Sequence, residues 1–187
     1  THNLIYEIRD LCGVAHLPSD CHAIGPITWP GWERVGEPAP WDKSDADATV
    51  YVNAGTLAIH AGALERLVEE VERLGVRVLA STGQDGFRRT GERSFCRPLL
   101  SPTPATRTAD VVVCTGGIGA CYHNLACGVP SLVVPMQPEQ ATNGLHFQQQ
   151  GCARALVPQV VFTGRSAQYA DAIDYSRFAT VLREMLA

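Results

Sequence analysis

Short apolar runs alternate with amphipathic stretches along most of this chain. The run Val111-Val112-Val113, for example, is typical of a strand that is buried on both faces. The stretches between the runs repeat their apolar residues at helical spacing, as in the stripe from Leu64 to Leu74. The expected strands are 49–53, 76–80, 95–100, 111–113, 131–134 and 154–157. The expected helices are one that ends at Gly75, then 120–127, 139–150 and 171–186.

This alternation predicts an α/β fold, a Rossmann-like, doubly wound parallel sheet of about six strands with helices on both faces. A loop rich in proline, 101–104, is expected before the central strand. Ligands bind such sheets at the carboxyl ends of the strands. Two glycine turns, at Gly55 and at Gly116 to Gly119, are expected to open at that edge.

Residues 1–48 have a different character, and we expect them to form a leader and interdomain linker packed on a domain that spans 49–187. The apolar residues of 4–11 recur at helical spacing, which predicts a short helix there. Residues 18–47 are rich in proline, glycine and tryptophan and are expected to form loops. Two interpretations of the tryptophans stay open, a connector between domains or a surface loop whose indoles cover the domain.

Composition and charge narrow the possible partners. The chain has 187 residues, 45% of them apolar, and a formal net charge of −4, which suits an ordinary globular domain. It has no lysine or arginine cluster for nucleic acid, no apolar run of the roughly 20 residues that a membrane span needs, and no signal-peptide pattern. We therefore expect a cytoplasmic chain whose partners are small molecules. It opens with Thr1 rather than methionine, which suggests a fragment of a longer protein.

The seven cysteines include no Cys-x-x-Cys pair, which argues against a zinc site or a disulfide framework. We expect reduced, mostly buried thiols and no metal. Cys114 and Cys121 flank the glycine loop, where a helix N-terminus favours reactive thiols. Burial as small apolar residues is the better interpretation of both.

The stretch 111–140 carries the candidate site. Its strand runs directly into the glycine loop from Thr115 to Gly119, and the free N–H groups of the following helix point toward that loop. Such an arrangement is typical of anion sites, above all for phosphate. After the next strand and two prolines, the chain presents Glu139 and Gln140, whose side chains suit hydroxyl groups. Phosphate and hydroxyl recognition together indicate a sugar nucleotide.

A dinucleotide site is the weaker interpretation. The Gly-x-Gly-x-x-Gly pattern is incomplete, because Tyr122 occupies the position of the third glycine. Glu139 lies 20 residues after Gly119, as an acidic ribose ligand would, but it sits beyond two prolines rather than at a strand tip.

The same residues resemble the C-terminal, donor-binding half of GT-B glycosyltransferases, the group of the macrolide, glycopeptide and plant natural-product sugar transferases. The family pattern runs His-Gly-Gly-x-Gly-Thr-x-x-Glu-Ala, then Gly-Val-Pro, then Pro-x-x-x-Asp/Glu-Gln-x-x-Asn-Ala. The resemblance covers about residues 20–157, including the linker-like 24–26 and the strand-like 50–56. The matching residues, at the same spacing, are Gly116, Gly117, Gly119, Gly128, Val129, Pro130, Pro135, Glu139, Gln140 and Asn143.

The resemblance implies a donor site, with the ribose at His123 and the donor sugar at Glu139 and Gln140. It places the diphosphate against Gly55, Thr56, Thr115, Gly116, Gly117, Ile118, Gly119 and Ala120. Three polar contacts of the family differ, since Thr115 replaces His, Ala120 replaces Thr or Ser, and His123 replaces the ribose-binding Glu. Thr115 and His123 still carry hydrogen-bonding groups, which implies altered binding. A histidine paired only with solvent or backbone is the equal alternative for His123.

The resemblance also implies a reaction, the transfer of a hexose from a UDP- or dTDP-sugar to a hydroxyl of a small-molecule acceptor. Loop amides and the helix N-terminus would stabilise the departing diphosphate without a metal or other cofactor. The acceptor pocket and catalytic base belong to the N-terminal half in this family, so we expect no catalytic residue here and an inactive fragment. The alternatives are a non-catalytic binding or interaction module of the same fold and, less favoured, an NAD-linked enzyme.

Overall fold

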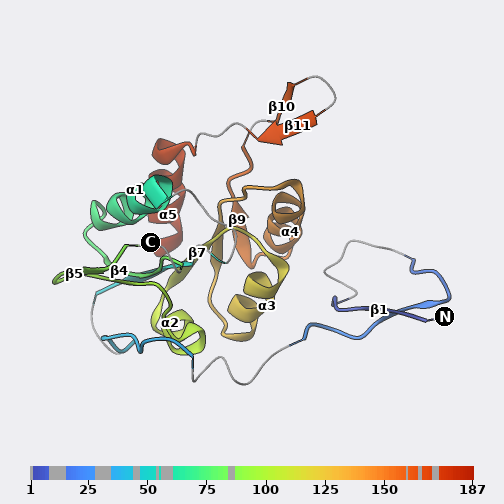
Figure 1. Cartoon of the computed structure of the whole chain (residues 1–187), viewed down its shortest axis with the longest axis horizontal. Coiled ribbons are helices and arrows are strands. Elements are labelled where there is room, and N and C mark those ends of the chain that lie inside the picture. Colours follow the sequence, from blue (N-terminus) through green and yellow to red (C-terminus); the bar gives the residue numbers. More distant parts are fainter. Residues whose placement is uncertain are drawn as a thin grey trace.

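The computed structural model describes residues 2–8, 16–27, 35–43, 47–53, 55, 61–83, 87–158, 160–163, 166–169 and 173–187. Figure 1 shows a central sheet with helices on both sides, a separate strand pair near the N-terminus and a protruding hairpin. The helices are α1 Ala61–Glu72, α2 Pro102–Thr108, α3 Ile118–Ala126, α4 Pro138–Gln149 and α5 Tyr175–Leu186. The strands are β1 Asn3–Ile5, β2 Cys21–Ala23, β3 Thr49–Asn53, β4 Arg77–Ser81, β5 Arg89–Thr90, β6 Ser94–Arg97, β7 Val111–Cys114, β8 Ser131–Val133, β9 Ala153–Ala155, β10 Val160–Thr163 and β11 Ser166–Tyr169. Among the described residues, no helix has the length and apolar character needed to cross a membrane.

The main sheet has seven strands in the order β5-β6-β4-β3-β7-β8-β9. Every neighbouring pair is parallel except β5 with β6. The predicted α/β class and the parallel sheet are therefore confirmed. The antiparallel edge strand β5 has two residues, too few to leave a pattern in the sequence.

Successive residues of the strands face two different apolar layers. In β3, Val50 and Val52 pack in the layer that includes residues of α1 and α5, whereas Tyr51 packs in the layer that includes residues of α3 and α4. Side chains alternate across a strand, so both faces of the sheet are buried. This double burial explains why the strands are continuously apolar in sequence.

Two sequence predictions about secondary structure are wrong. Residues 101–104 are mostly helical, because α2 begins at Pro102. Proline suits the first turn of a helix, where its missing N–H has no acceptor in any case.

The helix expected within 4–11 is also wrong, since β1 pairs in parallel with β2. Residues 9–11 lie outside the described part of the chain. The antiparallel hairpin β10–β11 occupies a segment for which the pattern predicts no element.

The segment 35–43 is fastened along the domain. Glu37 forms a parallel bridge with Leu100, and Gly36 lies so close that a Cβ on it would come within 2.6 Å of the Leu100 carbonyl carbon. Further along, Lys43 forms an ion pair with Asp110 at 2.8 Å. The tryptophans at 29 and 32 lie outside the described residues. The role of this segment as an interdomain linker stays a prediction.

Candidate functional site

Gly116 is held inside the fold. It follows β7 with a φ of +91°, in the region that glycine tolerates best. A Cβ on it would meet Val133 Cγ1 at 2.6 Å and the carbonyl oxygen of Gln140 at 2.7 Å. Gly116 is therefore required where the turn passes between β8 and α4, a role that differs from the ligand approach expected for the whole glycine loop.

Gly117 and Gly119 face open space instead. A Cβ on either residue would have no neighbouring heavy atom within 4 Å, and Gly117 has an ordinary φ of −57°. Gly117 is the N-cap of α3 and provides no side-chain cap. The backbone bond from Cys121 N to the oxygen of Gly117, at 3.1 Å, closes the first turn of the helix. The N–H groups of Ile118, Gly119 and Ala120 have no acceptor within that helix, so this end suits an anion.

The turn after β3 opens beside this loop. β3 and β7 are neighbouring parallel strands, with Asn53 opposite Cys114, so their carboxyl ends meet at the same edge, as predicted. Gly55 has a φ of +68°, and a Cβ on it would lie 3.8 Å from Oγ1 of Thr115. Gly55 and Thr115 therefore border the same space, whereas Thr56 lies outside the described residues.

The first turn of α4 is tied to the glycine loop. Asn143 Nδ2 donates to the carbonyl oxygen of Gly116 at 3.0 Å and to Oε1 of Glu139 at 2.6 Å. Glu139 is exposed, and within the described part of the chain its Oε2 has no hydrogen-bond partner. The sequence assigned no role to Asn143, although its spacing of four residues from Glu139 on a helix is a signal for such a contact.

Gln140 is buried, with only 1% of its surface exposed. Its Oε1 accepts a hydrogen bond from Met136 N at 2.8 Å. The side chain thus braces the turn between β8 and α4. A direct contact between Gln140 and a donor sugar stays a prediction.

His123 lies half-buried on α3, near the beginning of α2. Burial and the positive charge of Arg107 lower the pKa of His123, while a hydrogen bond with the carbonyl of Pro102 acts in the opposite direction. The imidazole is therefore neutral near pH 7, where it both donates and accepts hydrogen bonds. Its Nε2 lies 3.8 Å from Sγ of Cys127.

The cysteines next to the loop are buried in the core layer on the α3 and α4 side, as expected. The hydrogen bond with Cys114 and burial raise the pKa of Cys121, so its thiol stays protonated. Asn124 Nδ2 approaches Sγ of Cys114 at 3.9 Å and donates to Ser131 Oγ at 3.0 Å. These contacts make the thiols packing groups of the loop. Within the described ranges, no three His, Cys, Asp or Glu side chains are placed to hold a metal ion.

The sequence matches known glycosyltransferases. Residues 99–166 match the family model of the glycosyltransferase family 28 C-terminal domain. Over 145 residues, 76% of this chain, it is 28% identical to the PGL/p-HBAD biosynthesis rhamnosyltransferase of Mycobacterium bovis. The same share is 26% identical to a PGL/p-HBAD biosynthesis glycosyltransferase of Mycobacterium tuberculosis. The match covers 31% and 33% of those proteins, so the chain spans about a third of the length of these curated relatives.

Solved structures share the fold. The glycotransferase of kitacinnamycin superposes with a TM-score of 0.78 at 19% identity, over 100% of this chain and 46% of that one. The spinosyn rhamnosyltransferase SpnG, solved with thymidine diphosphate, gives 0.67 at 17% identity, over 98% of this chain and 48% of that one. Together with the sequence matches, these structures confirm the resemblance predicted from the glycine loop. The chain is similar to the GT-B glycosyltransferases and has the fold of their C-terminal domain.

Proposed function

We propose that this chain is the donor-binding half of a glycosyltransferase that moves a hexose from a UDP- or dTDP-sugar to a hydroxyl of a small acceptor molecule. The observation that carries the proposal is the open N-terminal end of α3. There, N–H donors without helical acceptors lie next to the free space over Gly117 and Gly119.

The diphosphate of the donor fits this end of α3. The N-terminus of a helix carries roughly half a positive charge, and its N–H groups are already directed outward. Gly55 borders the space from the turn after the neighbouring strand β3, and Thr115 borders it from the end of β7. Because these dipoles are in place before the reaction, they stabilise the charge that develops on the departing nucleoside diphosphate, without a metal or cofactor.

The ribose of the donor is assigned to His123, and its sugar to the first turn of α4. A neutral imidazole suits a ribose hydroxyl, because it donates and accepts. Glu139 offers an exposed carboxylate whose Oε1 is oriented by Asn143, which suits a sugar hydroxyl. Gln140 is assigned to the donor sugar as well, through its place beside Glu139 in the first turn of α4.

The names of the relatives support the nucleotide and the sugar class. SpnG is a rhamnosyltransferase solved with thymidine diphosphate, and the structure of Os79 from O. sativa, with a TM-score of 0.58 at 16% identity, contains UDP. The M. bovis relative is named as a rhamnosyltransferase. We propose that the acceptor pocket and the catalytic base come from a preceding N-terminal domain.

A ligand panel tests the proposal. Thermal shift and calorimetry would be run with UDP, dTDP, UDP-glucose, dTDP-rhamnose and NAD, since a ligand that binds the folded state raises its stability. We expect UDP or dTDP to bind and NAD to have no effect. Preference for NAD would favour the dinucleotide enzyme, and no binding at all would favour a non-catalytic interaction module.

A variant of Gly117 then locates the site. Gly117→Leu adds bulk where the backbone is open and φ is ordinary, so the fold is retained while the diphosphate loses its close approach. We expect nucleotide affinity to fall at least about tenfold, or about 1.4 kcal/mol. The matched control is Ala126→Leu, at the exposed far end of the same helix. Equal affinities in both variants would contradict the assignment.

A further inference from the structure

The thiols of Cys114 and Cys121 are in contact beneath the glycine loop. Cys114 is the last residue of β7, and Cys121 lies in the first turn of α3. Both side chains are buried, and the two thiols form a hydrogen bond with each other. The loop 115–120 is the whole of the sequence between them. A bond between the two sulfurs would therefore close a ring that contains the candidate diphosphate site.

Several hydrogen-bond donors are directed at the sulfur of Cys114. A hydrogen bond from the Cys121 thiol lowers the pKa of Cys114, against the opposing effect of burial. The N–H of Gly116 and the hydroxyl of Ser131 also donate to this sulfur and lower its pKa further. Asn124 Nδ2 approaches the same sulfur at 3.9 Å. Such donors stabilise a negative charge on sulfur, and the thiolate is the form of cysteine that attacks other groups.

Cys121 has the complementary character. The hydrogen bond with Cys114 and burial raise the pKa of Cys121, so its proton stays on sulfur. That proton points at the sulfur of Cys114, which is where a hydroxyl leaving from an oxidised Cys114 would need it. A second thiol beside an oxidised cysteine is the usual arrangement for forming a disulfide.

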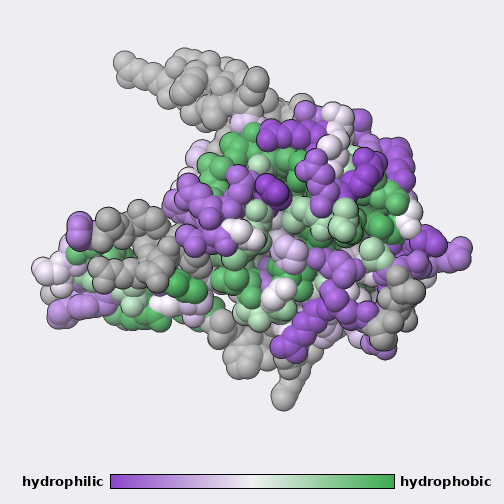
Figure 2. Space-filling model, turned by 180° about the vertical axis from the view of Figure 1, so that it is seen from behind, coloured by the Kyte–Doolittle hydropathy of each residue, from purple (hydrophilic) through white to green (hydrophobic). Residues whose placement is uncertain are grey.

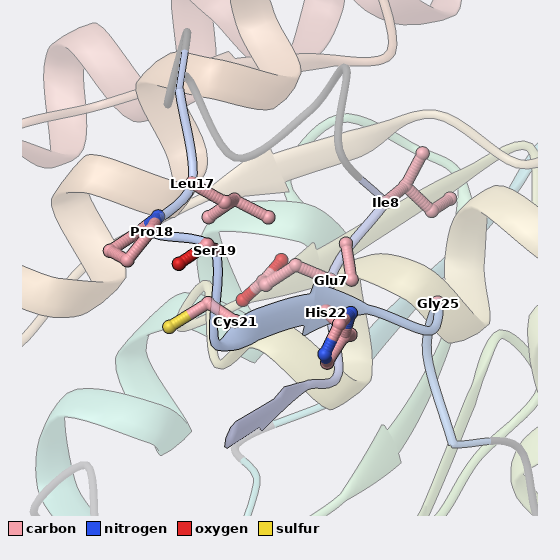
Figure 3. A pocket seen from close by; sticks show the side chains of 9 residues that line it. Glu7, Ile8, Leu17, Pro18, Ser19, Cys21, His22 and Gly25 are labelled. Atoms are coloured by element: carbon pink, nitrogen blue, oxygen red, sulfur yellow. The ribbon is translucent and has the colours of Figure 1, made fainter. Parts of the chain in front are cut away.

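Two other cysteines serve as comparisons. Cys96 is buried in the other apolar layer, where burial raises the pKa of its thiol to about 11. Cys21 belongs to β2, on the lobe that lies beside the main sheet in Figure 1 and Figure 2. Figure 3 shows its sulfur directed away from the ring of His22, and Oδ1 of Asp20, an acceptor, lies 3.8 Å from this sulfur. Cys96 thus provides a buried thiol for comparison with Cys114, and Cys21 a partly exposed one.

We propose that Cys114 and Cys121 are an oxidation site, at which a small hydroperoxide converts the two thiols into a disulfide that closes around the glycine loop. In the first step the sulfur of Cys114 attacks hydrogen peroxide. The S–O bond forms, the O–O bond breaks, and the departing hydroxide takes up a proton to become water. In the second step the sulfur of Cys121 attacks the sulfenic acid. The S–S bond forms, the S–O bond breaks, and the proton of Cys121 leaves with the hydroxyl as a second water.

Access to the pair is through the loop above it. The sulfurs are buried, so the reaction requires a brief local opening. The outer side of the loop is open, because a Cβ on Gly117 or Gly119 would have no heavy atom within 4 Å. Hydrogen peroxide is close to water in size and is therefore suited to this route.

The disulfide changes the geometry of the loop. A disulfide bond is only about 2.05 Å long, much shorter than the contact between two hydrogen-bonded sulfurs. Its formation draws the first turn of α3 toward the end of β7 and displaces the N–H groups of that turn. Weaker nucleotide binding is the expected consequence, and this part of the proposal rests on the proposed function.

Peptide mapping tests the oxidation site directly. The reduced chain is treated with graded hydrogen peroxide, the remaining thiols are blocked with iodoacetamide in denaturant, and the peptides are analysed by mass spectrometry. We expect a disulfide between Cys114 and Cys121 that forms at least about tenfold faster than Cys96 is oxidised. Oxidation of Cys114 no faster than that of Cys96, or oxidation of Cys114 without a bond to Cys121, would overturn the proposal.

Cys121→Ser separates the two steps. The new hydroxyl still donates toward Cys114 but forms no disulfide, so Cys114 should stop at the sulfenic acid, which dimedone traps. The matched control Cys96→Ser should form the disulfide as the unmodified chain does. Absence of the dimedone adduct would contradict the role of Cys114 as the attacking sulfur. If Cys121→Ser does not fold, the rates at Cys114 and Cys96 in the unmodified chain decide the matter.

Nucleotide affinity separates this proposal from the proposed function. Calorimetry with UDP and dTDP compares the reduced, the oxidised and the re-reduced chain. We expect oxidation to lower the affinity at least about tenfold and dithiothreitol to restore it, since exchange with a thiol reverses the disulfide. Unchanged affinity in a fully oxidised chain would overturn the proposed effect on binding. A reduced chain that binds neither nucleotide but still forms the disulfide would contradict the donor site and support the oxidation site.

Discussion

Gly116 and Gly117 are neighbours in sequence, yet their surroundings assign them different roles. The space for a side chain at Gly116 is occupied by Val133 and the backbone of Gln140, whereas the space at Gly117 is open. Sequence alone locates both glycines in one loop but cannot separate them, because the difference depends on how α4 crosses β8. The same holds for Gln140, a polar residue whose burial no hydrophobic pattern reveals.

Gly116→Ala should destabilise the fold strongly. A left-handed φ on a residue with a Cβ costs about 1–3 kcal/mol, and forcing a methyl group into a filled space costs about 1–3 kcal/mol more. The control Gly117→Ala should lower the free energy of unfolding by no more than about 1 kcal/mol, the cost of alanine at an N-cap. Urea denaturation of both variants measures the difference. Similar losses in the two would contradict the assigned packing role of Gly116.

Gln140→Ala should lower both stability and sugar recognition. Removing Oε1 leaves the partly buried N–H of Met136 without its acceptor, which costs about 1 kcal/mol or more. Because the turn before Glu139 loses its brace, affinity for the nucleotide sugar should fall more than affinity for the bare nucleoside diphosphate. Calorimetry with dTDP-rhamnose and dTDP makes the comparison. Unchanged stability with equal affinities would count against both roles.

At the scale of elements, the strands were predictable and the shortest elements were not. Strands β3, β4 and β7 are buried on both faces, which leaves an unmistakable apolar run in the sequence. α2 was missed because two prolines within 101–104 favour a loop in any local interpretation, although both lie in the first turn of a helix. β1 was missed because its partner β2 lies far away in sequence and three residues show no period. Long-range pairing decides such elements.

The contacts of Asp110, between the segment 35–43 and β7, give a prediction for pH. Burial tends to raise the pKa of Asp110, but hydrogen bonds from Lys43 and from Thr49 N outweigh it and hold the pKa below the ordinary value of 3.8. A depressed pKa in the folded state means that the carboxylate stabilises the fold above that ordinary value and loses this contribution as pH falls below it. Asp110→Asn should therefore be less stable than the unmodified chain at pH 7.

The difference between the two should shrink as the pH falls below about 4. Denaturation of both proteins from pH 7 to pH 3 measures how this difference changes. A constant difference at every pH would show that Asp110 acts through packing alone.

On the scale of the whole molecule, the main sheet is covered on both faces, and the candidate site lies at one of its edges. The two apolar layers cover both faces of the main sheet, while the space beside Gly117 and Gly119, at the carboxyl ends of the strands, is open. The glycine loop and the open N-terminal end of α3 were predictable because they are local features of a strand followed by a helix. The exposure of Leu4 and Ile24 was not predictable, since it depends on the pairing of β1 with β2, which lie far apart in sequence.

The purified 187-residue chain should bind its donor but transfer no sugar. We propose that the acceptor pocket and base come from another domain, so we expect this chain to provide no group that activates an acceptor hydroxyl. A coupled assay for released UDP or dTDP, run with phenolic and sugar acceptors, should give the rate of the buffer alone. Turnover that depends on the chain and on the acceptor would contradict this division of labour.

The two hydrogen bonds of Asn143 have a consequence for altering donor preference. Because this side chain connects the carbonyl of Gly116 with Glu139, the glycine loop and the start of α4 are expected to move together. If α4 alone were exchanged for the helix of a relative, the new helix would meet a glycine loop whose contacts are specific to the original α4. A graft with boundaries before β7 and after β9 transfers the glycine loop, Asn143 and α4 together. We therefore expect these boundaries to suit chimeras that exchange sugar specificity.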